Sequence, residues 1–132
     1  MNLDRIRTML SEAYCDDEYP VCLGQARRWG VSRPFSGLTV LDATPVFRNT
    51  MVKYLALIAG GARLIVGIRP NGYMSDGNIV QLLRESGITV VSSDEGQTEA
   101  VDVVLDCAAS FAHWEARLGY VEITRSGEPV YA

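Results

Sequence analysis

The segment 36–68 constrains the fold more than any other part of the sequence. Residues 38–41 form a short apolar run with two β-branched side chains, which predicts a buried strand over about 38–42. Residues 44–58 carry apolar side chains at helical spacing, and the glycines at 60–61 predict the end of that helix. A second apolar run, 62–68, follows at once. These features predict a strand–helix–strand unit whose two strands are parallel neighbours joined by a right-handed crossover.

The rest of the sequence continues this alternation. We expect helices over 3–13, 21–29, 76–86 and 111–118, strands over 88–92, 101–105 and 120–124, and a possible closing hairpin that ends in 129–131. The connection 93–100 is shorter than the dozen or so residues that a helical crossover between parallel strands needs. Either one helical turn fills this connection, or the fourth strand is placed unconventionally.

These elements predict a three-layer α/β domain. We expect one domain over residues 1–132, in which a helical segment over 1–35 packs on a sheet domain over 36–132. The strands are continuous apolar runs, as is typical of parallel strands covered on both faces. The expected architecture is therefore Rossmann-like or flavodoxin-like, with a mainly parallel sheet, helices on both faces and the possible C-terminal β-hairpin.

The composition excludes several classes of partner. The chain of 132 residues has a net charge of -4 and a pI near 4.9, which disfavours nucleic acid and anionic membranes. No apolar run reaches the roughly 20 residues of a membrane helix, and the N-terminus lacks the apolar core of a signal peptide. Cys15, Cys22 and Cys107 are odd in number and follow no metal-ligand spacing. We therefore expect reduced thiols, no metal site and a cytoplasmic protein.

Four segments occur in an order that resembles the substrate domain of S-adenosylhomocysteine hydrolases. In that family an arginine- and aromatic-containing helix end precedes a proline–glycine turn, a strand, a helix and a Gly-Ala pair. The corresponding segments here are 27–62 (RRWGVSRPFSG through GGA), 85–91 (ESGITVV), 101–110 (VDVVLDCAAS) and 119–131 (GYVEITRSGEPVY). This resemblance implies a related α/β fold over about residues 23–131.

The departures from the family concern its active site. The His and Thr that serve the family's adenosine site are replaced by Pro45 and Phe47, and an active-site Glu by Ile123. The family's paired acids and paired glycines after the fourth strand become Asp-Cys and Ala-Ala at 106–109. The sequence also contains no G-x-G-x-x-G turn of a nicotinamide-cofactor domain, whose hydride chemistry the family's reaction requires. We therefore expect no bound cofactor and no hydrolysis of S-adenosylhomocysteine by this chain alone.

Polar residues at the carboxyl ends of the predicted strands form the candidate site, because ligands of open α/β sheets bind there. The candidate ligand-binding residues are Asp42, Thr44, Arg48, Asn49, Arg69, Asp106 and Glu122. The acids suit ribose hydroxyls or a ligand ammonium, and the arginines suit a carboxylate or phosphate. The competing interpretation is that Asp42, Thr44 and Asp106 only cap helices and that the arginines are solvated. Of all these residues, Asp106 is the strongest single candidate.

No catalytic residue is identified. His113 is the sole histidine, and we expect it to be a surface or half-buried residue. A pair with Cys107 is disfavoured because six residues do not place two side chains on one helical face. The rings of Trp29, Phe35 and Trp114 suit a core or a subunit interface. Because the domain has many large rings and lacks the family's second domain, we expect a homodimer.

Two classes of function remain open. One is a non-hydrolytic small-molecule-binding protein, or a small biosynthetic enzyme, with a nucleoside- or amino-acid-like ligand. The other is a protein-interaction module, such as an immunity or antitoxin-like protein. A deep cleft in which Arg48, Asp106 and Glu122 converge favours the first class. A filled cleft with an exposed acidic or aromatic patch favours the second.

Overall fold

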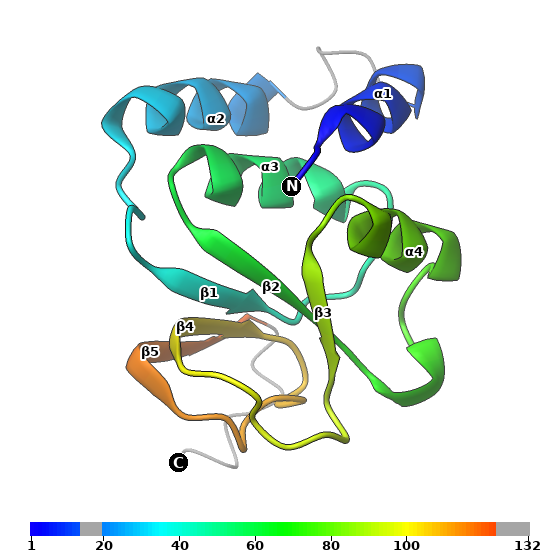
Figure 1. Ribbon diagram of the computed structural model, residues 1–132, viewed down its shortest axis with the longest axis vertical. Helices are drawn as coiled ribbons and strands as arrows, with labels where there is room; N and C mark the ends of the chain where they lie inside the picture. The colour runs from blue at the N-terminus through cyan, green and yellow to red at the C-terminus, as the bar shows by residue number, and fades with distance from the viewer. Residues whose placement is uncertain (14–19, 124–132) are drawn as a thin grey trace.

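The computed structural model describes residues 1–13 and 20–123, and Figure 1 shows its arrangement. The predicted hairpin ending in 129–131, the residue Cys15 and the matched Thr124 lie outside the described residues. The elements are α1 (Asp4–Ala13), α2 (Pro20–Ser32), β1 (Thr39–Asp42), α3 (Thr50–Ala59), β2 (Arg63–Ile68), η2 (Pro70–Gly72), α4 (Gly77–Glu85), β3 (Thr89–Ser92), β4 (Val101–Asp106) and β5 (Ala116–Glu122).

The strands form one five-stranded sheet in the order β3-β2-β1-β4-β5, and every neighbouring pair is parallel. The predicted α/β class with a Rossmann-like parallel sheet is confirmed. The strand order reverses between β1 and β4, so this is the topological switch point of the sheet. In the part of the chain that the structure describes, no helix is both long and apolar enough to cross a membrane.

The helices gather on one face of the sheet (Figure 1). The chain moves from β1 through α3 to β2 and through α4 to β3 in one direction, and right-handed crossovers therefore place α3 and α4 on the same face. The side chains of Tyr54 on α3 and Ile79 on α4 are buried against β2. Outside them, α1 packs on α3 and α4, and α2 packs on α3.

Turns, and not a helix, cover the opposite face of the sheet. The helix predicted over 111–118 is therefore wrong. Residues 108–113 form turns and β5 already begins at Ala116, because parallel pairing with β4 overrides the local helical pattern. The buried rings of Phe111 and Trp114 pack at 5.6 Å, edge to face, over the central strands. A Cβ at Gly67 would lie 2.6 Å from the Phe111 ring, so β2 needs glycine there. In the described residues, the expected helices on both faces are thus present on one face only.

The short connection 93–100 contains no helix and returns across this second face from β3 to β4. Its return direction is opposite to that of the first two crossovers, so a right-handed connection must use the opposite face. Neither predicted alternative holds, because the connection contains no helical turn and β4 pairs in parallel with β1, the usual position of a fourth strand in this sheet order. The connection is fixed at one end by Ser93, whose N–H donates to the Ile68 carbonyl at 2.8 Å.

The helix predicted to begin near Pro45 begins only at Thr50. Val46 instead bridges in parallel to Ser75, and its carbonyl accepts a hydrogen bond of 2.8 Å from the Asp76 N–H. Asp42 and Thr44 therefore do not cap α3, which contradicts the helix-cap interpretation for those two residues. Asp76 itself caps α4, where its carboxylate accepts from the Asn78 N–H at 2.9 Å.

Candidate functional site

The predicted site residues lie at the carboxyl edge of the sheet or just before α3, but only some of them come together. The structure places Asp42 and Thr44 at the end of β1, Arg48 and Asn49 before α3, Arg69 after β2, Asp106 at the end of β4 and Glu122 at the end of β5.

Asp42 is fully buried and is held by two neighbours. The ammonium of Lys53 on α3 lies 2.8 Å from Oδ2, and the Thr44 hydroxyl donates to Oδ1 at 2.7 Å. Lys53 also lies 2.5 Å from the Thr44 hydroxyl, and its side chain is 35% exposed. Lys53 was not among the predicted site residues. Its signal was the single charge in the otherwise apolar helix TMVKYLALIA.

Tyr54 follows Lys53 and is the largest wholly buried side chain among the described residues. Its hydroxyl is buried without a hydrogen-bond partner in the described structure. Burial, and secondarily the negative charge of Asp42, raise the pKa of Tyr54 well above its ordinary value near 10. The carboxyl end of β1 thus contains one paired carboxylate and one unpaired hydroxyl, both shielded from solvent.

Asp106 is also fully buried, and both of its carboxylate oxygens accept hydrogen bonds from within the chain. The Cys107 N–H donates to Oδ1 at 2.7 Å, and the Phe111 N–H donates to Oδ2 at 2.7 Å. The Tyr120 hydroxyl donates to the same Oδ2 at 2.5 Å. Asp106 therefore fixes the turn 107–111 and ties it to β5.

Glu122 acts on the same turn. Its carboxylate accepts from the Ala109 N–H at 2.9 Å and lies 3.5 Å from the Tyr120 hydroxyl. Ala108 and Ala109 have φ values of 56° and 55°, in the left-handed region that glycine favours. The glycine-like backbone is therefore present here with alanine side chains, at a cost on the order of 1–2 kcal/mol for each residue.

Arg69 joins this turn to the loop after β2. Its Nε donates to the Ser110 hydroxyl at 3.0 Å, and its Nη2 donates to the Cys107 carbonyl at 3.4 Å. The guanidinium also lies 5.4 Å from the centre of the Tyr73 ring. Arg69 is thus bonded within the chain rather than solvated, which corrects that part of the competing interpretation.

Backbone strain is concentrated in these two loops. Among the described residues, five non-glycine residues have positive φ, and all but Arg33 lie there. The four are Asn71, Met74, Ala108 and Ala109. Such conformations persist only where the surrounding structure fixes them, and they are concentrated at functional sites.

Arg48 and Asn49 do not join the carboxylates. Both are exposed, and neither side chain makes a hydrogen bond or ion pair within 1–13 and 20–123. The cavity that the described residues line between the ends of β1 and β2 has a volume of about 10 Å³, close to what one water needs. Arg48, Asp106 and Glu122 therefore do not converge on a deep cleft there.

His113 is exposed and its Nε2 lies 3.2 Å from the Glu95 carbonyl oxygen. Its ring stacks on Phe111 at 5.9 Å. Cys107 is buried in the turn after β4. No group of three or more potential metal ligands occurs among the residues that the structure describes.

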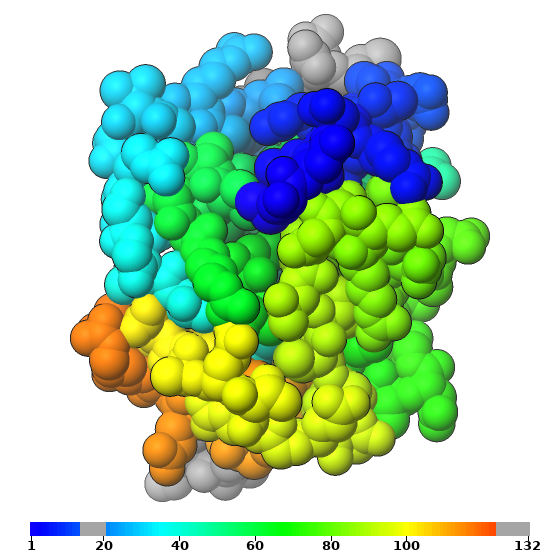
Figure 2. All heavy atoms as spheres, in the orientation of Figure 1, coloured from blue at the N-terminus to red at the C-terminus, as the bar shows by residue number. Residues whose placement is uncertain are grey.

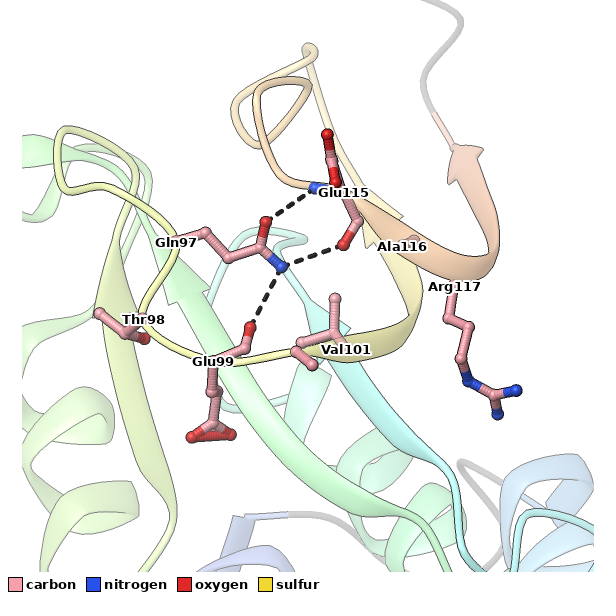
Figure 3. Close-up of a pocket in the computed structure, with 8 residues that line it drawn as sticks. Gln97, Thr98, Glu99, Val101, Glu115, Ala116 and Arg117 are labelled. Atoms are coloured by element: carbon pink, nitrogen blue, oxygen red, sulfur yellow. Dashed lines mark hydrogen bonds between the residues drawn. The ribbon is translucent and has the colours of Figure 1, made fainter.

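A larger hollow, of about 550 Å³, lies at the opposite, N-terminal edge of β4 and β5 (Figure 3). The side-chain amide of Gln97 donates to the carbonyls of Glu99 and Glu115, at 3.1 and 3.0 Å, and accepts from the Glu115 N–H at 2.9 Å. Hydrogen bonds from the Thr39 N–H and, secondarily, from Arg117 hold the pKa of Asp102 below its ordinary value. These polar groups hold the connection 93–100 to the strands, so the hollow has a structural explanation.

No protein-family model matches this chain, and no curated protein matches its sequence. The function must therefore be inferred from the geometry.

Proposed function

We propose that this chain is a protein-interaction domain, without hydrolase activity, that pairs with a second copy of itself through the carboxyl edge of its sheet. The observation that carries this proposal is an exposed apolar and basic surface over buried carboxylates that are already hydrogen-bonded internally. We call this surface, formed by Phe47, Arg48, Tyr73 and Met74, the edge patch. The three apolar side chains of the edge patch are 41%, 64% and 44% exposed, respectively.

The edge patch is continuous because its two loops are bonded to each other. The Val46 N–H donates to the Met74 carbonyl at 3.3 Å, which places Phe47 beside the loop after β2. In Figure 2 that loop, in green, projects at the lower right of the molecule. Aromatic residues, Met and Arg are enriched in the buried centres of protein interfaces, and this composition supports a contact surface.

A second copy fits the edge patch because the surrounding charges are complementary. Arg48 lies in the patch itself, in the loop between β1 and α3, and the exposed Asp94 and Glu95 follow β3 at the same carboxyl edge of the sheet. Adjacent strands lie about 4.8 Å apart, so the ends of β1 and β3 are separated by roughly 10 Å. A two-fold axis through the patch would therefore place the acidic end of one copy against Arg48 of the other.

Charge reversal tests this pairing directly. We expect light scattering to show a dimer at 50 µM, and Arg48→Glu to yield a monomer because it places like charges together. The double variant Arg48→Glu, Glu95→Arg should dimerise again, because each copy then carries both reversed charges. Arg84→Glu, which reverses an exposed charge on α4, is the matched control. A monomeric wild type would refute the proposal. Equal loss of the dimer in Arg48→Glu and in the control Arg84→Glu would also refute it.

Small-molecule binding at the β4–β5 end of the same edge is the second candidate function. It is favoured by the convergence of Asp106 and Glu122 on Tyr120, in a turn that keeps a glycine-like backbone. A ligand that binds only the folded state raises its melting temperature. We expect adenosine or homocysteine to raise it if this candidate is correct, and an unchanged melting temperature with both at millimolar concentration would contradict it.

A further inference from the structure

An apolar groove lies among α1, α2 and α3, on the outer side of the helical layer, and it is unrelated to the carboxyl edge. We call it the helical groove. Its volume is about 390 Å³, within the range of small-molecule pockets. Its floor consists of apolar side chains from all three helices, namely Leu10, Leu23, Ala26, Val52, Leu55 and Ala59.

The groove exists because small side chains occur where the helices face one another. α2 packs on α3, and α1 contacts α3 as well as α4 (Figure 1). Ala26 on α2 and Ala59 on α3 leave space that larger residues would fill. Leu10 on α1 is buried, while Leu23 and Leu55 are half-buried, so part of the apolar floor faces the groove and not the core.

Two arginines stand at the rim of this apolar groove, Arg7 from α1 and Arg27 from α2. Both are exposed. Arg7 lies 3.7 Å from Asp4, whereas Arg27 forms no ion pair or hydrogen bond in the part of the chain that the structure describes. This arrangement contrasts with the net charge of -4 of the whole chain. An apolar floor with a cationic rim is complementary to a molecule that has an apolar chain and one anionic end.

We propose that the helical groove binds a monomeric medium-chain carboxylic acid, with its hydrocarbon chain on the leucine floor and its carboxylate at Arg27 and Arg7. Guanidinium groups bind carboxylates through charge-assisted hydrogen bonds, so the head group contributes specificity. The apolar chain contributes affinity through burial. This binding is independent of the pairing proposed for the edge patch.

Titration calorimetry with decanoate below its micelle concentration tests the proposal. We expect one molecule bound per chain, and Arg27→Gln should weaken binding about tenfold, which corresponds to about 1.4 kcal/mol. Arg84→Gln, an equivalent neutralisation on α4, should leave it unchanged. Decanol should bind more weakly than decanoate and should be insensitive to Arg27→Gln, because it carries no charge. Binding only above the micelle concentration, or equal binding to the wild type and Arg27→Gln, would overturn the proposal.

Cys22 provides a second measurement because its half-buried thiol lines the same groove. Decanoate should slow the alkylation of Cys22 by iodoacetamide, and peptide mapping by mass spectrometry separates this site from Cys15 and Cys107. In Arg27→Gln, the same decanoate concentration should protect Cys22 less. Alkylation of Cys22 at an unchanged rate in saturating decanoate would place the acid elsewhere and contradict the proposal.

Discussion

Replacing Tyr54 by Phe removes one hydroxyl and leaves the ring that fills the helical side of the core. The residue is fully buried, and its hydroxyl lacks a hydrogen-bond partner in the described structure. A buried donor without a partner costs roughly 1–3 kcal/mol of desolvation. Because the oxygen also makes some packing contacts, each worth about 0.1–0.2 kcal/mol, we expect Tyr54→Phe to stabilise the fold by about 1 kcal/mol. For a chain of 132 residues, this raises the melting temperature by about 4 °C.

The same variant should alter the pH dependence of stability. Burial raises the pKa of Tyr54 in the folded state above the unfolded value near 10. The free energy of unfolding of the wild type is therefore at its full value below that unfolded pKa. It falls as pH rises further, because the unfolded chain loses the tyrosine proton first. At one pH unit above that value the wild type has lost about 1.4 kcal/mol through this residue, whereas the phenylalanine variant loses nothing there. The stability difference between the two proteins should therefore widen from about 1 kcal/mol at pH 8 to more than 2 kcal/mol at pH 11.

Urea unfolding followed by tryptophan fluorescence measures both effects. Tyr120→Phe is the matched control, since it makes the same chemical change at a hydroxyl that donates to Asp106 at 2.5 Å. It should destabilise the fold by about 1.5–3 kcal/mol, the usual contribution of a hydrogen bond to a charged group. A destabilised Tyr54→Phe, or a difference from the wild type that does not change with pH, would refute the reasoning about Tyr54.

Three further predictions concern the sheet and its carboxyl edge. Gly67→Ala should lower the free energy of unfolding by about 1–3 kcal/mol in urea titrations, because its Cβ would lie 2.6 Å from the Phe111 ring; an unchanged midpoint would mean that the ring moves aside freely. Asp106→Asn should lower the free energy of unfolding by about 1.5–3 kcal/mol in the same assay, because its amide NH2 replaces a carboxylate oxygen that accepts hydrogen bonds from neighbouring donors. Unchanged stability would contradict a purely internal role for Asp106. The purified chain should release no homocysteine from S-adenosylhomocysteine, with or without nicotinamide cofactor, and thiol release above a heat-killed control would contradict this.

The parallel sheet could be predicted because its signal is local and strong. The runs at 38–41 and 64–68 contain no charged residue, and a strand that is buried on both faces produces that pattern. The helix predicted over 111–118 was wrong because the structure of this segment is decided by distant contacts and not by its local pattern. Its apolar residues fit a helix locally, but Phe111 packs over the sheet from a turn and Ala116 pairs with β4. Strand pairing between distant segments is a tertiary effect that no local window contains.

Candidate residues could be placed at the carboxyl edge, but their partners could not. The rule that strand ends meet at one edge was sufficient to locate Asp42 and Asp106. It could not show that Lys53 would lie against Asp42 or that Tyr120 would lie against Asp106, because those contacts depend on the packing of α3 and on the register of β5. The edge patch was also missed, since its exposure depends on two loops that pair with each other.

The turn after β4 shows why acids at the carboxyl ends of strands need not serve a ligand. Ala108 and Ala109 hold a left-handed backbone that costs on the order of 1–2 kcal/mol for each residue. Asp106 accepts three hydrogen bonds around this turn, and Glu122 accepts one from Ala109. At about 1.5–3 kcal/mol for each hydrogen bond to a charged group, these contacts are large enough to offset the strain. The geometry of the turn therefore accounts for both carboxylates without a bound molecule, whereas no contact within the described residues accounts for the exposed apolar side chains of the edge patch.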